Sequence, residues 1–219
     1  MANTLQNPRV ASELDRMYAA SREQMTQLRA KGNELGRPMT TEERTAAMSE
    51  FYIPVTPEAG RLLYSLVRAI RPATVVEFGM SFGISAIHLA SAVRDNGTGR
   101  IVTTELSATK IAAARQTFVD TGLDDVITIL EGDALSTLAD LNAPADFVLL
   151  DGWKDLYLPV IKLLEPRLAP GVLVVADNAS SPGMQPYLDY VREPLNGYVS
   201  FNFLVRDSDS MEISCRTTD

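Results

Sequence analysis

Acidic and amide side chains follow two apolar runs in the second half of the chain. Asp151 ends the run "FVLLD", and Asp177 and Asn178 end the run "LVVADN". Two carboxylates and a carboxamide form a hard oxygen set of the kind that suits Mg²⁺. Each residue taken alone is explained at least as well as a cap of a helix or turn. All three at the ends of neighbouring strands favour a metal site instead.

Histidine and cysteine are too scarce for several other kinds of site. The chain has one histidine and one cysteine, which argues against a zinc site and excludes an internal disulfide. The single cysteine is typical of a reducing compartment. His88 stands between two apolar residues of an expected helix, and we interpret it as a core or surface residue rather than a base.

The overall charge limits the partners. The 219 residues carry a net charge of -8, which argues against nucleic acid because binding to phosphates requires clustered Lys and Arg. No apolar run approaches the length of about 18 residues that a membrane span requires, and no apolar signal core precedes residue 18. We expect a cytoplasmic enzyme with one domain, in which residues 1–50 form a helical extension and 51–219 an α/β core that binds cofactor and metal.

The pattern of apolar and polar residues changes after Pro72. Short apolar runs rich in β-branched residues alternate from there with amphipathic segments of helical length. This pattern predicts a Rossmann-like, doubly wound, mostly parallel sheet of about seven strands. The last two runs, 198–205 and 210–216, predict a hairpin and hence an antiparallel C-terminal strand. Ligands of such sheets bind beyond the carboxyl ends of the strands.

The first 70 residues predict helices. One apolar stripe repeats at three- and four-residue spacing, which predicts a long amphipathic helix that packs on the domain or on a second copy; its members are Val10, Leu14, Met17, Tyr18, Met25 and Leu28. On this stripe we base an expected homodimer. Residues 33–40 predict a turn, Thr40 or Thr41 a helix cap, and Thr56 before Pro57 another.

A glycine turn follows the first expected strand. In "VVEFGMSFGIS" (75–85), Gly79 and Gly83 would let the backbone approach a ligand at a helix N-terminus. A tight turn without ligand is the alternative, and the spacing is not that of a dinucleotide fingerprint. Glu77 is a carboxylate in an apolar strand and requires a partner, such as a ligand ammonium or a backbone amide. Glu105, at the next strand end, is placed to accept ribose hydroxyls.

The third strand end carries Asp133 and Ala134, which would flank an adenine ring. Asp133 is equally well explained as a helix N-cap, and the two roles are compatible. Asp155 is also most simply a helix cap. A glycine turn, an acid that could accept ribose hydroxyls and this third polar position together indicate an adenosine ligand.

These segments resemble the cation-dependent class I O-methyltransferases, most closely the catechol O-methyltransferases. "LLDGWKDLYLP" and "ADNASSPG" resemble the metal-binding segments, and "VVEFGMSFGISA" resembles the S-adenosylmethionine loop, within a similarity from about Phe51 to Phe201. The resemblance implies Mg²⁺ on Asp151, Asp177 and Asn178, and Lys154 as general base. The implied cofactor-binding residues are Val55, Thr56, Glu77, Gly79, Ser81, Gly83, Ser85, Glu105, Asp133, Ala134, Asp151 and Trp153. Substrate contacts are expected from Phe51, Ile53, Lys154 and Asn178.

The implied chemistry agrees with these residue types. A phenol of pKa about 10 is a poor nucleophile at neutral pH, and coordination to a divalent cation favours its ionised form. Lys154 lies three residues after Asp151. It must be neutral to act as a base, and a nearby cation with partial burial would lower its pKa.

Two positions depart from the family pattern. The glutamate that catechol enzymes carry on the penultimate strand has no counterpart in "YVSFNFLV", and Gly152 replaces the family's histidine. The predicted function is Mg²⁺-dependent methyl transfer from S-adenosylmethionine to one hydroxyl of a small catechol-type substrate.

Three alternatives belong to other classes. An NAD-dependent oxidoreductase lacks its glycine fingerprint here. A methyltransferase for a non-catechol acceptor, including nitrogen on protein or nucleic acid, lacks an N-P-P-[YF] segment after the fourth strand. A non-catalytic scaffold would gain nothing from crowded carboxylates.

Overall fold

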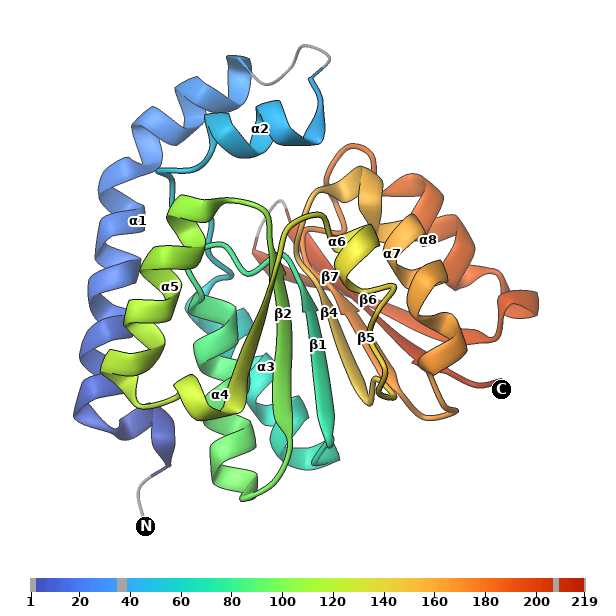
Figure 1. Cartoon of the computed structure of the whole chain (residues 1–219). Helices are drawn as coiled ribbons and strands as arrows, with labels where there is room; N and C mark the ends of the chain where they lie inside the picture. The colour runs from blue at the N-terminus through green and yellow to red at the C-terminus, as the bar shows by residue number, and fades with distance from the viewer. Residues whose placement is uncertain (1–2, 35–38, 207–208, 219) are drawn as a thin grey trace.

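Seven strands form one sheet, in the order β3-β2-β1-β4-β5-β7-β6, in the computed structural model of the chain (Figure 1). The structure describes residues 3–34, 39–206 and 209–218. Strands β1 to β5 pair in parallel, and β7 pairs antiparallel with both β5 and β6. The prediction of a Rossmann-like, mostly parallel sheet with an antiparallel C-terminal strand is therefore confirmed.

The elements alternate along the chain much as the apolar runs predict. The strands are β1 (Thr74–Phe78), β2 (Arg100–Glu105), β3 (Ile127–Glu131), β4 (Phe147–Leu150), β5 (Leu173–Ala176), β6 (Tyr198–Arg206) and β7 (Asp209–Arg216). The α-helices are α1 (Pro8–Glu34), α2 (Thr41–Ala47), α3 (Pro57–Ile70), α4 (Ile84–Asn96), α5 (Ala108–Thr121), α6 (Ala134–Thr137), α7 (Tyr157–Leu164) and α8 (Gln185–Arg192). Short 3-10 helices are η1 (Thr4–Gln6), η2 (Asp124–Val126), η3 (Lys154–Leu156), η4 (Glu165–Arg167) and η5 (Pro194–Asn196). Across the part of the chain that the structure describes, no helix combines the length and apolar character needed to cross a bilayer.

The central strands are buried on both faces because successive side chains enter two different cores. Val75 and Leu149 point into the core made with α1, α3, α4 and α5. Val76 and Leu150, their neighbours in sequence, point into the core made with α6, α7 and α8. Alternation of this kind explains why the runs are continuously apolar rather than half polar. The sheet is thereby rigid where its carboxyl ends carry the polar residues discussed below.

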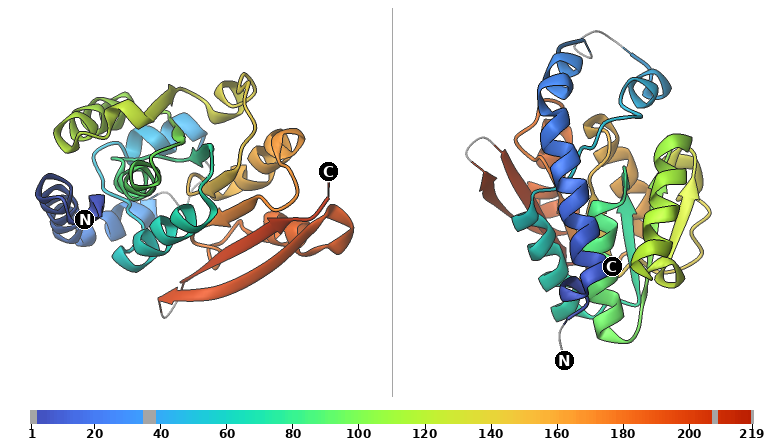
Figure 2. Two further views of the ribbon diagram at one scale, coloured as in Figure 1. Left: turned by 90° about the horizontal axis from the view of Figure 1, so that it is seen from below. Right: turned by 90° about the vertical axis from the view of Figure 1, so that its left-hand side faces the viewer.

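The N-terminal helix α1 packs onto the domain. Val10, Leu14 and Met17 are buried in the first core, and α1 contacts α5 and α4. Figure 2 shows α1 along the outer side of the helices that cover this sheet face. Of the two alternatives for the apolar stripe, packing on the domain is confirmed for these three residues. The homodimer and the division at residue 50 stay predictions.

Helix starts follow the expected cap chemistry. Thr40 accepts a hydrogen bond from the Glu43 amide in a capping box, so Thr40 rather than Thr41 caps α2. Thr56 accepts from the Ala59 amide at the start of α3, with Pro57 at the first helical position. The predicted turn at 33–40 falls partly on residues 35–38, which lie outside the described residues.

His88 lies in the contact between α3 and α4. Its ring packs on Gly60 so closely that a Cβ there would come within 2.4 Å of Nε2. The Tyr18 hydroxyl lies 3.3 Å from that nitrogen, and burial lowers the pKa of His88 to about 4. His88 is therefore a neutral core residue.

Candidate active site

A cleft of about 250 Å³ opens at the carboxyl ends of β1 to β4. Helix α2 borders it from the N-terminal part of the chain (Figure 1). The cleft is lined by ten of the residues that the sequence analysis singles out: Ile53, Gly79, Ser81, Glu105, Asp133, Ala134, Asp151, Trp153, Lys154 and Asn178. Ser85 lines a smaller cavity beside it, together with Ile53, Ser81 and Asp151. The predicted site residues therefore supply ten of the twenty side chains and glycines that line the cleft.

Six predicted residues, all of them within the described ranges, line neither cavity: Phe51, Val55, Thr56, Glu77, Gly83 and Asp177. Val55 is buried in the first core, and Thr56 caps α3. Gly83 packs on the ring of Phe118. These three have structural roles at their positions, whereas Glu77 and Asp177 lie just behind the wall of the cleft.

Gly79 holds the end of β1 against the segment that follows β4. Its φ is +97°, and a Cβ there would lie 2.6 Å from the backbone of Gly152. Only glycine fits this approach. The close contact brings the loop before α4 beside Asp151, so this loop and the acidic segment form one wall.

Glu105 is fixed at the cleft by backbone amides. Its Oε1 accepts from the amides of Leu106 and Ser107, and its Oε2 accepts from the amide of Ser81, each at 2.8 Å. Ser81 has a φ of +51°, a conformation that non-glycine residues rarely adopt. Its hydroxyl accepts from Lys110 Nζ at 3.0 Å. We call Gly79, Ser81 and Glu105, where the sequence predicts a cofactor, the cofactor side of the cleft.

Glu77 is a buried carboxylate in which one oxygen has no hydrogen-bond partner. The side chain is fully buried; Thr103 donates to Oε2, while Oε1 has no partner. Burial raises the pKa of Glu77 to about 7, opposed in part by the nearby hydroxyls of Ser85 and Thr103. An orphaned carboxylate oxygen next to a cavity is a feature that a cationic ligand group would satisfy.

The start of α6 and the loop after β4 form the end of the cleft where the sequence predicts an adenine ring. Asp133 accepts from the Ser136 amide at 3.0 Å, so its predicted role as helix cap is confirmed. Asp133 also lines the cleft, next to buried Ala134. Both readings of Asp133 are therefore compatible in the structure, as the sequence suggests.

Helix α2 is tied to the segment after β4. Arg44 Nη1 and Nη2 each donate to Asp155 at 2.9 Å, and its guanidinium lies 4.8 Å from the centre of the Trp153 ring. Trp153 Nε1 donates to Thr45 Oγ1 at 3.2 Å. Asp155 makes no cap contact at the start of α7, so the expectation of a helix cap is wrong. Asp155 instead binds Arg44 and so holds α2 against Trp153.

Three carboxylates and an amine gather at the ends of β4, β5 and β7. Lys154 Nζ lies 3.8 Å from Asp151 Oδ1. Asn178 Nδ2 donates to Asp209 Oδ2 at 2.7 Å, and Asp177 is 3% exposed. We call Asp151, Asp177 and Asp209, with Asn178 and Lys154, the acid cluster.

The charges in the acid cluster shift one another. Burial raises the pKa of Asp151 well above its usual range, and the charge of Asp177 adds to this. Burial lowers the pKa of Lys154, while Asp151 and Asp177 oppose that effect. Like charges crowded away from water favour either proton uptake or a bound cation. Burial therefore makes the neutral form of Lys154 more accessible than in a free lysine, whereas the acids favour a counter-ion.

The donor set suits a hard divalent ion. Among residues 3–34, 39–206 and 209–218, no three His, Cys, Asp or Glu side chains are grouped as a metal cage. Asp151 and Asp177 would need the amide oxygen of Asn178 as the third ligand. A carboxylate only accepts, so the contact with Asp209 must use the Asn178 nitrogen, which leaves the amide oxygen free to face a cation. Two carboxylates and one amide oxygen fit Mg²⁺.

Two members of this region were missed in the sequence. Asp209 begins β7, and the antiparallel pairing Ala176↔Glu212 carries it past the end of β5. Tyr157 accepts from Lys154 Nζ at 2.6 Å and donates to the Asp177 carbonyl at 3.2 Å. The available signal for Asp209 was its position between the last two apolar runs, as the last acid of "RDSD" (206–209). No comparable signal marks Tyr157, whose reach depends on the helical turn after Lys154.

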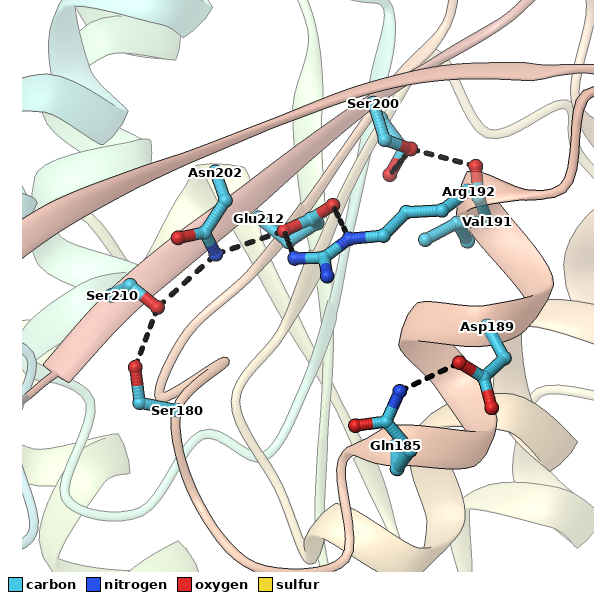
Figure 3. Close-up of polar contacts among 10 residues, drawn as sticks. Ser180, Gln185, Asp189, Val191, Arg192, Ser200, Asn202, Ser210 and Glu212 are labelled. Atoms are coloured by element: carbon cyan, nitrogen blue, oxygen red, sulfur yellow. Dashed lines mark hydrogen bonds and ion pairs between the residues drawn. The ribbon is translucent and has the colours of Figure 1, made fainter.

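A polar network behind the cluster fixes the loop that follows β5 (Figure 3). Ser180 and Ser210 share a hydrogen bond of 2.8 Å, and Asn202 donates to both Ser210 and Glu212. Arg192 donates to both oxygens of buried Glu212, at 2.8 and 2.7 Å. Glu212 is thereby engaged away from the cleft and does not replace the missing family glutamate.

Comparison with known proteins identifies the family. A family described as "Methyltransferase domain" matches residues 76–179. Catechol O-methyltransferase B of Danio rerio is 33% identical over 150 residues, which cover 65% of this chain and 56% of that enzyme. The chain thus matches little more than half the length of this relative.

Further similarity comes from a second relative and a solved structure. The catechol O-methyltransferase of Sus scrofa is 33% identical over 140 residues, 61% of this chain and 74% of that enzyme. The O-methyltransferase TomG from Streptomyces achromogenes, solved in complex with SAM, shares the fold with a TM-score of 0.67 at 24% identity, over 87% of this chain and 96% of that one. The chain belongs to the O-methyltransferase family that includes the catechol O-methyltransferases.

Proposed function

We propose that this chain transfers a methyl group from S-adenosylmethionine to one hydroxyl of a small aromatic vicinal diol, with Mg²⁺ in the acid cluster. The observation that carries the proposal is the position of Lys154, whose amine lies in the cleft wall between Asp151 and Tyr157. S-adenosylmethionine would supply an electrophilic methyl group, and the divalent cation would supply Lewis-acid stabilisation of an ionised hydroxyl.

Lys154 receives the proton of the acceptor hydroxyl. Burial lowers the pKa of Lys154, so the neutral amine that a base requires is available at lower pH than for a free lysine. Tyr157 stays protonated because burial raises its pKa, and its hydroxyl donates to the Asp177 carbonyl. Its oxygen therefore accepts one Lys154 N–H and leaves the lone pair of the amine for the substrate.

Asp151, Asp177 and Asn178 would hold the cation. Bringing it to the cluster would remove the repulsion that raises the pKa of Asp151. Asp209 would keep the amide of Asn178 turned so that its oxygen faces the cation. It also supplies an acid near the site, where "YVSFNFLV" lacks the glutamate of the catechol enzymes.

The cofactor side would hold S-adenosylmethionine. Glu105 lines the cleft and is held rigidly by three amides, so it can accept ribose hydroxyls without reorganising. Ala134 and Trp153 line the same cleft where the resemblance expects the adenine. The free oxygen of Glu77, behind Gly79, suits the ammonium of the methionine part.

The test is a direct assay of methyl transfer. The full chain is incubated with S-adenosylmethionine and 3,4-dihydroxybenzoate, with Mg²⁺ or with EDTA, and the methylated product is followed by mass spectrometry. We expect product only with Mg²⁺. Lys154→Met should lower kcat by about 10²- to 10⁴-fold, the usual contribution of general acid–base catalysis.

A matched control separates this role from general damage. Lys162 lies on α7 over the ring of Tyr190 and outside the cleft; Lys162→Met should retain activity. Cofactor binding by calorimetry without product from any diol would point to a non-catechol acceptor. Absence of cofactor binding would contradict the methyltransferase proposal itself.

A further inference from the structure

Lys110 is a buried lysine that the proposed mechanism does not use. It lies in the first turn of α5, just after β2, and is 5% exposed. It also lines the cleft. Lysine is almost never buried to this extent without a partner, so the position of this amine in the cleft wall requires an explanation.

The amine of Lys110 has hydrogen-bonding capacity left. Its Nζ donates to Ser81 Oγ at 3.0 Å and lies 5.5 Å from the centre of the Phe82 ring. A lysine ammonium carries three N–H donors. Within residues 3–34, 39–206 and 209–218, the bond to Ser81 is the one hydrogen bond that this amine makes. A buried group at the cleft wall therefore still has donors for a ligand.

Ser81 links this amine to Glu105. The backbone amide of Ser81 donates to Glu105 Oε2 at 2.8 Å, while its hydroxyl accepts from Lys110 Nζ. Burial lowers the pKa of Lys110, and the charges of Glu105 and Asp151 oppose that effect. The amine therefore lies beside the carboxylate to which the proposed function assigns the ribose of the cofactor.

The Glu105 carboxylate has room for one ribose hydroxyl at most. Its two oxygens already accept three backbone amides, those of Ser81, Leu106 and Ser107, and a carboxylate offers about four lone-pair sites. A ribose presents two vicinal hydroxyls, and each hydroxyl both donates and accepts hydrogen bonds. The second hydroxyl therefore needs another partner.

The carboxylate of the methionine part is the other cofactor group that an amine could bind. Free amides at the start of α4 favour that anion, and Ser85 of this helix lines the smaller cavity but not the cleft. Lys110 lines the cleft but not the smaller cavity. This difference favours the ribose at Glu105 as the group that Lys110 binds.

We propose that Lys110 is a further cofactor-binding residue, which donates a hydrogen bond to one ribose hydroxyl while Glu105 accepts one from the other. The inference rests on the proposed function for the identity of the cofactor. Each hydroxyl then has its own protein partner. A site of this kind rejects a ligand that lacks either hydroxyl, because a buried polar group is left unpaired.

The experiment is a thermodynamic cycle between Lys110 and the ribose, measured by isothermal titration calorimetry on the full chain. The ligands are S-adenosylhomocysteine, which has no methyl group to transfer, and its 2′-deoxy and 3′-deoxy analogues. In the wild type, each deoxy analogue should bind about 10- to 100-fold more weakly than the parent. In Lys110→Met, one of the two analogues should bind within about threefold of the parent, while the other keeps its wild-type penalty.

Two variants separate direct contact from indirect effects. Ser81→Ala removes the observed partner of Lys110 but leaves the amine, so both analogues should keep their penalties. Lys162 lies outside the cleft, and Lys162→Met should bind all three ligands as the wild type does. The melting temperature of each variant serves as the folding check.

Equal penalties in the wild type and in Lys110→Met would overturn the inference, because Lys110 would then act only through Ser81 or on another part of the cofactor. A wild type in which either hydroxyl contributes less than about threefold would also overturn it, whether or not Lys110→Met folds. Loss of one penalty in Lys110→Met supports the inference even if no diol is methylated. Absence of binding by the wild type contradicts both the inference and the proposed function.

Discussion

The two halves of the cleft solve the problem of buried charge in different ways. On the cofactor side, the Glu105 carboxylate is fully engaged by three backbone amides at 2.8 Å. In the acid cluster, burial raises the pKa of Asp151, and the nearby charges of Asp177 and Asp209 add to this. The first half is stable as it stands. The second is strained by repulsion that a divalent cation would relieve.

The difference separates binding from reactivity. Backbone amides keep Glu105 in one place and do not titrate, which suits a group that holds a ligand. Burial lowers the pKa of Lys154 although the neighbouring acids oppose this effect, and a perturbed pKa suits a group that moves protons. Substitutions in the two halves should therefore have different signatures.

Asp151→Asn should produce the largest effect and should separate activity from stability. Loss of a metal ligand should reduce methyl transfer by more than the roughly 10- to 100-fold typical of outer-shell partners. Without metal, removal of one of three acids should raise the free energy of unfolding by about 1 kcal/mol, or roughly 2–4 °C in Tm. Asp140→Asn, at an exposed position, is the control for both assays. A metal-free Asp151→Asn protein that melts below wild type would contradict the description of the cluster as strained.

Glu105→Gln should weaken binding without changing chemistry. The amide NH₂ would face one or two of the three N–H donors, so the loop at Ser81 would lose its anchor. We expect the Kd for S-adenosylmethionine to rise about tenfold, or roughly 1.4 kcal/mol, with kcat little changed. Isothermal calorimetry checks this, with Glu131→Gln at the exposed end of β3 as control. Equal losses in kcat and affinity would contradict the view that Glu105 acts in binding and not in the chemical step.

Glu77→Gln should change how stability depends on pH. Burial raises the pKa of Glu77 to about 7 in the folded chain from a reference value of 4.5. The unfolded chain therefore loses this proton first as pH rises, and the stability that Glu77 contributes below pH 4.5 is lost as pH passes 7. Relative to wild type, the variant should gain stability between pH 5 and pH 8 in denaturant titrations. Parallel curves for the two proteins would mean that Glu77 is ionised throughout.

Arg44→Ala should have the smallest effect. Its ion pair with Asp155 is partly exposed, and such pairs contribute about 0.2–1 kcal/mol. Loss of the contact with Trp153 adds to this, so we expect KM for the cofactor to rise a few-fold with kcat unchanged. A double-mutant cycle with Asp155→Ala isolates the pair. A large fall in kcat would place α2 in the chemical step.

Much of the fold is predictable because the central strands have no polar face. Runs such as "FVLL" and "LVVA" are apolar throughout, since alternate side chains enter two cores. Cap residues also obey local chemistry, as Thr56 and Asp133 show. Helix ends are harder to predict: α2 ends at Ala47, although the apolar residues Met48 and Phe51 follow it in the sequence.

The site residues that follow parallel strands are predictable from the sequence. The residue whose position depends on how β7 pairs with β5 is not. Asp151, Asp177 and Asn178 follow parallel strands, so their convergence follows from topology. Asp209 joins them only because β7 runs antiparallel beside β5. Phe51 and Val55 came from the resemblance, and neither lines the cleft or the smaller cavity beside it.

The most direct test of the strained acid cluster is thermal unfolding of the metal-free chain as Mg²⁺ is added, for wild type and Asp151→Asn, with equal ionic strength kept by NaCl. The account predicts that Tm of the wild type rises with Mg²⁺ and saturates, because the ion binds only the folded chain, while Tm of Asp151→Asn starts higher and stays level. Two proteins that respond alike, or a wild type that does not respond, would contradict it.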